Sequence, residues 1–222
     1  MTAFVELKGK VAAILWRWSL TKGLRNRTRR FGSPGEESQW ATMRVLETER
    51  LLLREFCQAD LNDLVTWEGP SGEEFTEAQA RRFLNFCFAE YFKLGVGRWG
   101  MLLKSTGGVV GNCGFCYINF KQKIGEVAYC IAPKYRGRGL AAEALGALIQ
   151  FGFADIGLAR IQARCGPDNT SSERVMQKAG MIFERMVLSR EASKSGSRTD
   201  KMYAVVSCDF KTYSKTGIPP GA

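Results

Sequence analysis

The stretch Y-R-G-R-G-L-A-A-E-A-L-G-A-L-I (Tyr135–Ile149) places two arginines and two glycines directly ahead of a segment with helical spacing. Because Gly137 and Gly139 have no Cβ atom, the backbone N–H groups of this turn can converge on one point. The start of the predicted helix adds unpaired N–H donors and a partial positive charge. The stretch therefore predicts a cradle for a phosphate group.

Two other interpretations of this stretch are a dinucleotide-binding fingerprint and a bare basic turn. G-R-G-L-A-A matches the pattern G-x-G-x-x-A, but Lys134, Tyr135 and Arg136 separate its glycines from the preceding apolar segment. The fingerprint also requires an acidic residue about 20 residues further on, where Gln162 stands. Both features argue against a dinucleotide site.

The segments on either side of the stretch alternate between strand and helix patterns. Upstream we expect one or two strands over residues 44–56 and then a short helix from Ala59 to Trp67. A second helix is expected to begin at the capping box Thr76–Gln79, and a hairpin is expected over residues 99–120. A strand ended by Pro133 precedes the loop, and helices over 140–156 and 171–179 alternate with three further strands. This order predicts an α/β (α+β) fold with a mixed, mostly antiparallel sheet of six to seven strands and helices on both faces.

The net charge of +10 is concentrated at the amino terminus. Residues 1–35 carry eight basic side chains and one acidic one, so +7 of the +10 belongs to them. We therefore expect a basic, partly amphipathic extension and linker over residues 1–42, a domain over 43–213 and a tail over 214–222. Binding of nucleic acid or an anionic membrane is expected only through the extension. The favoured interpretation of residues 1–42 is an ill-ordered extension or a start assigned too early, before Met43, and a targeting segment is the alternative.

The content of histidine and cysteine limits the chemistry. No histidine is present, which excludes Ser-His and Cys-His nucleophilic pairs and His-containing metal sites. Seven cysteines without a secretory signal favour a reducing, cytoplasmic setting. Cys113 and Cys116 have the spacing of a metal or redox motif, but in a strand they point to opposite faces, so we expect no metal site.

Two motifs at a fixed separation resemble the GNAT superfamily of acyl-CoA-dependent N-acetyltransferases, and most closely its RimJ/RimL-like, ribosomal-protein N-terminal type. Arg136, Gly139 and Ala141 match the family signature of Arg or Gln, two residues, Gly, one residue, and Gly or Ala. Asn169 and Ser172 match the Asn and Ser that open the following helix. The resemblance covers residues 43–210 and implies a sheet that splays at the acyl-CoA site.

The resemblance also implies which residues bind acetyl-CoA, with no metal involved. The pyrophosphate would lie on the loop, the pantetheine arm would pair with a strand edge, and Asn169 would bond that arm. The implied cofactor residues are Tyr129, Cys130, Ile131, Arg136, Gly137, Arg138, Gly139, Leu140, Ala141 and Asn169.

The implied reaction is direct attack of a neutral amine on the thioester, which requires a base and an acid. Glu126 is the expected base. The alternative interpretation is that Glu126 is an exposed strand carboxylate. Ser172 and Glu191 are the other implied catalytic residues. Met176 replaces a tyrosine that the family commonly uses as the acid. Tyr203 could substitute for it, but a tyrosine of the core is the favoured interpretation of Tyr203. Nothing near Cys130 in the sequence would lower the pKa of its thiol, so a role for Cys130 as a nucleophile is poorly motivated.

The acceptor side would be formed by the loop before the long helix and by the last hairpin. The acidic residues of that loop would attract a cationic amine or, alternatively, complement the helix dipole: Glu68, Glu73, Glu74 and Glu77. We expect a protein or peptide α-amine as acceptor, with a small amine (polyamine, aminoglycoside or amino acid) or a non-catalytic binding module as alternatives. A monomer and a homodimer are both compatible with the sequence.

Overall fold

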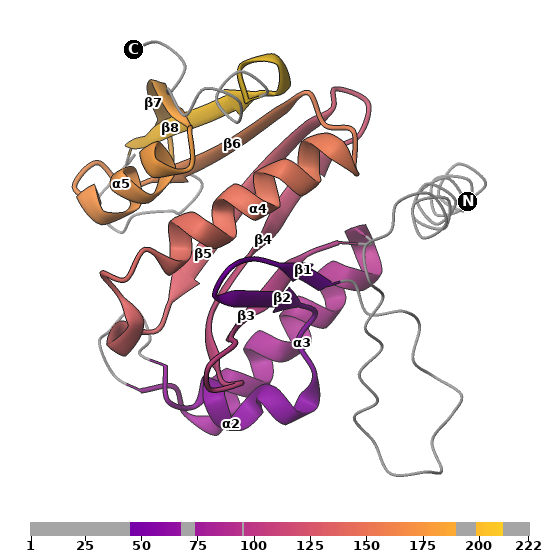
Figure 1. Ribbon diagram of the computed structural model, residues 1–222, viewed down its shortest axis with the longest axis vertical. Coiled ribbons are helices and arrows are strands. Elements are labelled where there is room, and N and C mark those ends of the chain that lie inside the picture. Colours follow the sequence, from indigo (N-terminus) through magenta and orange to yellow (C-terminus); the bar gives the residue numbers. More distant parts are fainter. Residues whose placement is uncertain (1–44, 68–73, 95, 190–198, 211–222) are drawn as a thin grey trace.

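The computed structural model describes residues 45–67, 74–94, 96–189 and 199–210. The expected extension over 1–42 and the tail over 214–222 lie outside these ranges. An eight-stranded sheet in the order β1-β2-β3-β4-β5-β6-β8-β7 runs through the molecule (Figure 1). All strand pairs are antiparallel except β5 with β6, as a mostly antiparallel mixed sheet requires.

The elements follow the predicted order, with one more strand than expected. The strands are β1 (Val45–Glu47), β2 (Leu51–Arg54), β3 (Arg98–Leu103), β4 (Val109–Asn119), β5 (Ile124–Ile131), β6 (Arg160–Cys165), β7 (Ile182–Leu188) and β8 (Thr199–Val206). The helices are α2 (Leu61–Leu64), α3 (Glu77–Leu94), α4 (Leu140–Ala154) and α5 (Thr170–Lys178), with short 3-10 turns η1 (Gln58–Asp60) and η2 (Pro133–Tyr135). The sheet has eight strands because the first apolar segment turns back on itself and forms both β1 and β2.

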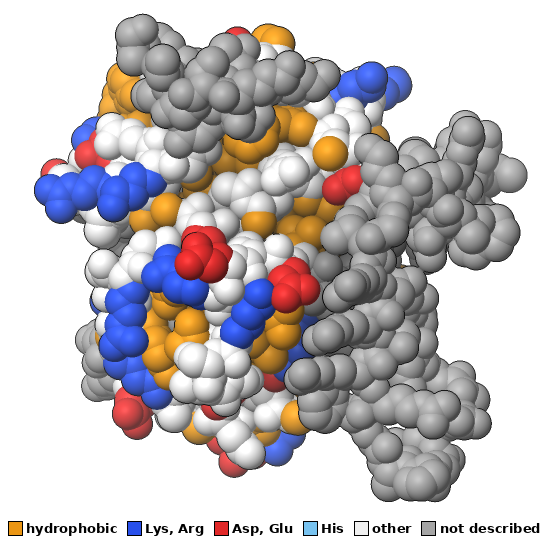
Figure 2. All heavy atoms as spheres, viewed as in Figure 1, with side chains coloured by type: hydrophobic (Ala, Val, Ile, Leu, Met, Phe, Trp, Pro, Cys, Tyr) orange, Lys and Arg blue, Asp and Glu red, His pale blue; other side chains and the backbone are white. Residues whose placement is uncertain are grey.

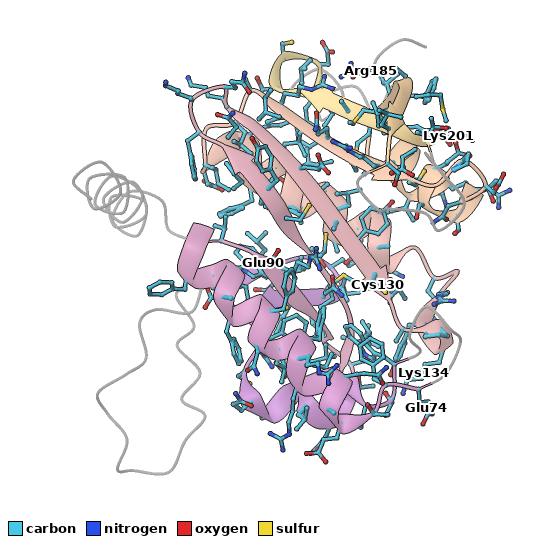
Figure 3. All side chains as sticks on the ribbon, turned by 180° about the vertical axis from the view of Figure 1, so that it is seen from behind. Glu74, Glu90, Cys130, Lys134, Arg185 and Lys201 are labelled. Carbon is cyan, nitrogen blue, oxygen red and sulfur yellow. The ribbon has the colours of Figure 1, made fainter. Side chains whose placement is uncertain are left out.

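The helices cover the two faces of the sheet. Helices α4 and α5 pack on one face and α2 and α3 on the other, as Figures 1 and 3 show from opposite sides. Two apolar clusters correspond to these faces, one centred on Leu145 and Leu148 of α4 and one on Leu84 and Cys87 of α3. The predicted capping box opens α3, because the Thr76 N–H donates to Gln79 Oε1 at 2.7 Å and the Gln79 N–H donates to Thr76 Oγ1 at 3.3 Å.

The sheet splays between β5 and β6. Residues 124–126 of β5 pair with residues 160–162 of β6, and β5 continues to Ile131 without β6 beside it. A β-bulge at Cys116 of β4 lies opposite this point, where the register shifts between Phe115 and Tyr117. An extra residue on one strand increases the local twist, which turns the end of β5 away from β6.

Gly114 allows β3 and β4 to approach closely. A Cβ atom at this position would overlap the backbone of Gly97 and Arg98. Gly114→Ala is therefore expected to lower the free energy of unfolding by about 3 kcal/mol, measured by urea denaturation. The control is Gly146→Ala in α4, where no atom lies near the added methyl group and alanine favours the helix by about 0.5–1 kcal/mol. Equal stability of the Gly114 variant and the wild type would contradict this packing.

No helix among the described residues is both long and apolar enough to cross a membrane. All seven cysteines lie in the described ranges and are free thiols.

Candidate active site

The loop between β5 and α4 has the backbone that its glycines predict. Gly137 and Gly139 adopt φ angles of 77° and 76°, in the left-handed region that other residues rarely enter. Gly139 is the N-cap of α4, and having no side chain it leaves the first N–H groups of the helix uncapped. A Cβ at Gly137 would meet no atom within 4 Å, so the space above the loop is open to a ligand.

The basic side chains of the loop hold it against the end of β5. The Arg136 Nε–H donates to the carbonyl of Ile131 at 3.2 Å, and Arg138 Nη2 donates to the carbonyl of Lys134 at 3.2 Å. The guanidinium of Arg138 also stacks on the Tyr135 ring, 5.4 Å from its centroid. Figure 2 shows Lys and Arg side chains gathered along this edge of the molecule, so the surface beside the loop is positively charged.

The predicted cofactor strand runs directly into this loop. Tyr129, Cys130 and Ile131 occupy the end of β5 beyond its last pair with β6, so their backbone lies along the splayed opening. The Tyr129 hydroxyl donates to the carbonyl of Ser172 at 2.9 Å, which ties β5 to the first turn of α5. A strand edge, a helix start and the glycine-containing loop therefore adjoin one another.

Glu126 lies at the point where β5 and β6 part. Its side chain is buried, and its Oε2 accepts from Gln162 Nε2 at 2.9 Å and from Arg164 Nη2 at 3.3 Å. Gln162 and Arg164 are on β6, so the carboxylate bridges the two strands at the base of the opening. The alternative of an exposed strand carboxylate is wrong, because Glu126 is only 6% exposed.

Sequence reasoning missed a second carboxylate, Glu90, near the end of α3. Desolvation raises the pKa of the Glu90 carboxyl, and the Arg98 guanidinium offsets only part of this effect. The two side chains are 3.8 Å apart at Glu90 Oε2 and Arg98 Nε, and both atoms are buried without a hydrogen bond. Figure 3 shows Glu90 and Cys130 in the middle of the molecule, where α3 faces the end of β5.

Asn169 and Ser172 lie at the start of α5, as the motif predicts. Asn169 Oδ1 caps the helix by accepting from the Ser172 N–H at 3.0 Å and from Ser171 Oγ at 2.8 Å. The side-chain oxygen of Asn169 thus already accepts two hydrogen bonds, whereas its side-chain amide nitrogen is left for a cofactor arm. The third implied catalytic residue, Glu191, lies outside the described residues.

The possible substitutes for the missing tyrosine have structural roles. Met176, which stands in place of that tyrosine, is part of α5, and its side chain is fully buried. Desolvation and the neighbouring Glu173 raise the pKa of Tyr203 to about 12, and its hydroxyl donates to Glu173 Oε1 at 2.9 Å. Tyr203 is therefore a core residue, as its favoured interpretation held.

The cysteine pair has no metal-site geometry. Cys113 is buried in the core beneath α4, whereas Cys116 is half-buried and donates to the Glu126 carbonyl at 3.4 Å. No group of three or more potential metal ligands occurs within the ranges that the structure describes.

The acidic loop expected on the acceptor side is described only in part. Glu74 is exposed, and Glu77 forms a surface ion pair with Arg81 at 2.6 Å. Glu68 and Glu73 lie outside the described residues. The Glu77–Arg81 pair supports the helix-start interpretation of Glu77.

Comparison with known proteins agrees with this geometry. Residues 50–182 match the model of the acetyltransferase (GNAT) domain family. The uncharacterized N-acetyltransferase YoaA of Bacillus subtilis is 31% identical over 172 residues, which cover 73% of this chain and 96% of that protein. The chain belongs to the GNAT acetyltransferase family and is an acyltransferase.

Solved structures share the same fold. An acetyltransferase (GNAT family) from Bacillus anthracis superposes with a TM-score of 0.63 at 28% identity, over 73% of this chain and 98% of that one. RimL, described as a ribosomal L7/L12 α-N-protein acetyltransferase, superposes with a TM-score of 0.63 at 17% identity, over 75% and 96%.

Proposed function

We propose that this acyltransferase moves an acetyl group from acetyl-CoA to the α-amine of a protein or peptide. One observation carries the proposal: the glycine loop at the start of α4 lies next to the end of β5, and this end of β5 does not pair with β6. Structures of this fold are described with acetyl-CoA and AMP, for MccE, and with coenzyme A, for RimL.

Acetyl-CoA would lie along the opening from the loop to the base of the splay. Its pyrophosphate would accept hydrogen bonds from the backbone of residues 136–141, and its pantetheine arm would pair with the edge of β5 at Tyr129–Ile131. A backbone N–H of this edge would then donate to the thioester carbonyl as negative charge develops on its oxygen. Asn169 would contribute its amide nitrogen to the arm.

The reaction would proceed by direct attack within a ternary complex. Glu126 would take the proton of the acceptor ammonium through a water molecule, and the neutral nitrogen would then bond to the carbonyl carbon. Collapse of the tetrahedral intermediate breaks the C–S bond, and the departing thiolate would receive a proton from the Ser172 hydroxyl. The nitrogen, which carries an extra proton after the attack, would give that proton back to Ser172 as it becomes the amide. Ser172 lies on the α5 side of the opening, across from the β5 edge to which Tyr129 ties it.

The fold shared with RimL, whose structure is described as that of an α-N-protein acetyltransferase, supports the proposal of an α-amine acceptor and of a RimJ/RimL-like type. A small-amine acceptor is the second candidate, because a spermidine N-acetyltransferase SpeG chimera from Vibrio cholerae and human SSAT shares the fold with a TM-score of 0.61 at 14% identity.

A panel of acceptors distinguishes these functions. Release of free CoA from acetyl-CoA would be followed with N-terminal peptides, spermidine, aminoglycosides and free amino acids. Thiol release with peptides alone supports the proposal, and release with small amines alone supports the second candidate. Retention of RNA or anionic vesicles without thiol release from any acceptor would instead favour a binding module that acts through its extension.

Cys130 provides a test of direct attack. Partial desolvation raises the pKa of its thiol, and Arg136 and Arg98 offset this only in part, so little nucleophilic thiolate forms at neutral pH. Cys130→Ala is therefore expected to change kcat by less than about threefold. Loss of activity together with an acetylated Cys130 in the wild type, detected by mass spectrometry, would instead indicate a covalent intermediate.

A further inference from the structure

A single ion pair connects the β1–β2 turn to the first turn of α4. Arg50 Nη2 lies 2.6 Å from Glu143 Oε2, and Arg50 Nε donates to the same oxygen at 2.7 Å. Glu143 Oε1 accepts from the Arg50 N–H at 2.8 Å and from Thr48 Oγ1 at 2.6 Å. Both carboxylate oxygens are thus held by one turn of the sheet edge, which faces the start of α4 (Figure 1).

The same guanidinium also reaches the glycine loop. Arg50 Nη1 donates to the carbonyl of Arg138 at 2.9 Å. Arg138 stands between the two left-handed glycines, and Arg50 Nη2 would lie 3.6 Å from a Cβ built on Gly139. One side chain therefore contacts both the helix start and the centre of the loop.

The bond to the Arg138 carbonyl sets the direction of the next N–H group. No peptide bond in the described residues is cis, and in a trans peptide the C=O and the N–H point in opposite directions. Because Arg50 holds the Arg138 carbonyl on its own side, the Gly139 N–H points to the opposite side of that peptide. Gly139 itself has a φ of 76°, in the left-handed region that glycine enters at little cost.

The ion pair also neutralises a carboxylate close to the expected phosphate. Glu143 lies in the first turn of α4. Desolvation alone would raise the pKa of the Glu143 carboxyl, but hydrogen bonds from Thr48 and Arg50 outweigh it and hold that pKa below its ordinary value. Glu143 is therefore anionic, and without Arg50 its charge would repel a phosphate on the loop.

We propose that Arg50 is a positioning residue for acyl-CoA, which orients the Gly139 N–H through the Arg138 carbonyl and cancels the charge of Glu143. The proposal rests on the proposed function, since it assumes that the loop binds the pyrophosphate. Arg50 needs no contact with the cosubstrate for this role.

The test compares the wild type, Arg50→Gln, Arg50→Lys and Glu143→Gln in the full chain, by calorimetric binding of acetyl-CoA and steady-state kinetics. Arg50→Gln is expected to raise Kd and KM for acetyl-CoA about tenfold, with kcat at saturation changed less than about twofold. Glu143→Gln is expected to have a smaller effect, because glutamine still accepts from Arg50 and removes the negative charge. The Kd of Arg50→Lys is expected to fall between those of these two variants, because lysine keeps the positive charge but lacks the several N–H donors of the planar guanidinium.

Lys104→Gln is the matched control. Lys104 holds the same β1–β2 turn from the other side, where its Nζ pairs with Glu47 at 2.9 Å and donates to the Glu49 carbonyl at 3.3 Å, without touching the loop. This variant loosens the turn equally, so its KM for acetyl-CoA is expected to stay at the wild-type value.

The double variant Arg50→Glu/Glu143→Arg separates positioning from stability. It can restore the ion pair, and with it the melting temperature, but it leaves the Arg138 carbonyl without its donor, so Kd is expected to stay high. Wild-type Kd in a folded Arg50→Gln variant, or in this double variant, would overturn the inference. If the wild type itself binds no acetyl-CoA, the proposed function fails instead.

Discussion

Gly139→Glu is expected to weaken acetyl-CoA binding at least about a hundredfold, as measured by calorimetry. The new carboxylate would stand at the N-cap of α4, where it adds a negative charge to the helix start at which the pyrophosphate is proposed to bind. Two like charges about 4 Å apart near a protein surface repel by about 4 kcal/mol, which exceeds the 2.7 kcal/mol of a hundredfold loss. Arg50 Nη2 lies 3.6 Å from a Cβ built on Gly139, but Arg50 is already paired with Glu143, so it is expected to offset only part of the new charge.

Two controls isolate the charge from the strain. Gly139→Gln imposes the same left-handed strain and nearly the same volume without the charge, so its loss of affinity is expected to be markedly smaller. Gly157→Glu places the same charge on another left-handed glycine, with φ of 78° and open surroundings, beyond the far end of α4. Its Kd for acetyl-CoA is expected to match the wild type. Unchanged affinity in a folded Gly139→Glu variant would remove the phosphate assignment of the loop.

The loop could be predicted from sequence because its determinants are local. The left-handed turns depend on Gly137 and Gly139 themselves, and the helix that follows begins directly after Gly139. The capping box of α3 was predictable for the same reason, since Thr76 and Gln79 are three residues apart. Local patterns of this kind do not require knowledge of which strands pair.

Features that depend on strand pairing could be predicted from the sequence only in part. The opposite orientation of Cys113 and Cys116 follows from the strand period, and the structure confirms it. The bulge at Cys116 does not follow, because a bulge is a property of two paired strands rather than of one. For the same reason the expected number of strands, six to seven, was smaller than the observed number. The pairing of β1 with β2 decides whether one apolar segment forms one strand or two.

Charged contacts between distant segments were not predictable. Arg50 and Glu143 are 93 residues apart, and nothing in the local sequence of either indicates the other. Glu90 had a weak signal, because it lies three residues after the buried Cys87 on a helix whose buried positions are otherwise apolar. A carboxylate at such a position indicates a partner or a function, but it does not identify which.

Glu126→Gln is expected to lower kcat by about 10²- to 10³-fold while leaving the Kd for acetyl-CoA within about threefold of the wild type. The amide keeps the shape of the side chain and can still accept hydrogen bonds from Gln162 and Arg164, so the base of the splay should stay assembled. What is lost is the ability to take up the ammonium proton of the acceptor. Single-turnover acetylation with preloaded acetyl-CoA measures this step directly.

Glu90→Gln is the matched comparison, because Glu90 is the other carboxylate near the opening and its pKa is raised by desolvation. If Glu126 is the base, Glu90→Gln should reduce kcat by less than about tenfold and act mainly on the KM for the acceptor, since a buried anion beside the opening attracts a cationic amine. The reverse ranking, with Glu126→Gln retaining most of kcat and Glu90→Gln losing it, would transfer the role of base to Glu90. Glu126 would then be a structural bridge that holds β5 and β6 together through Gln162 and Arg164.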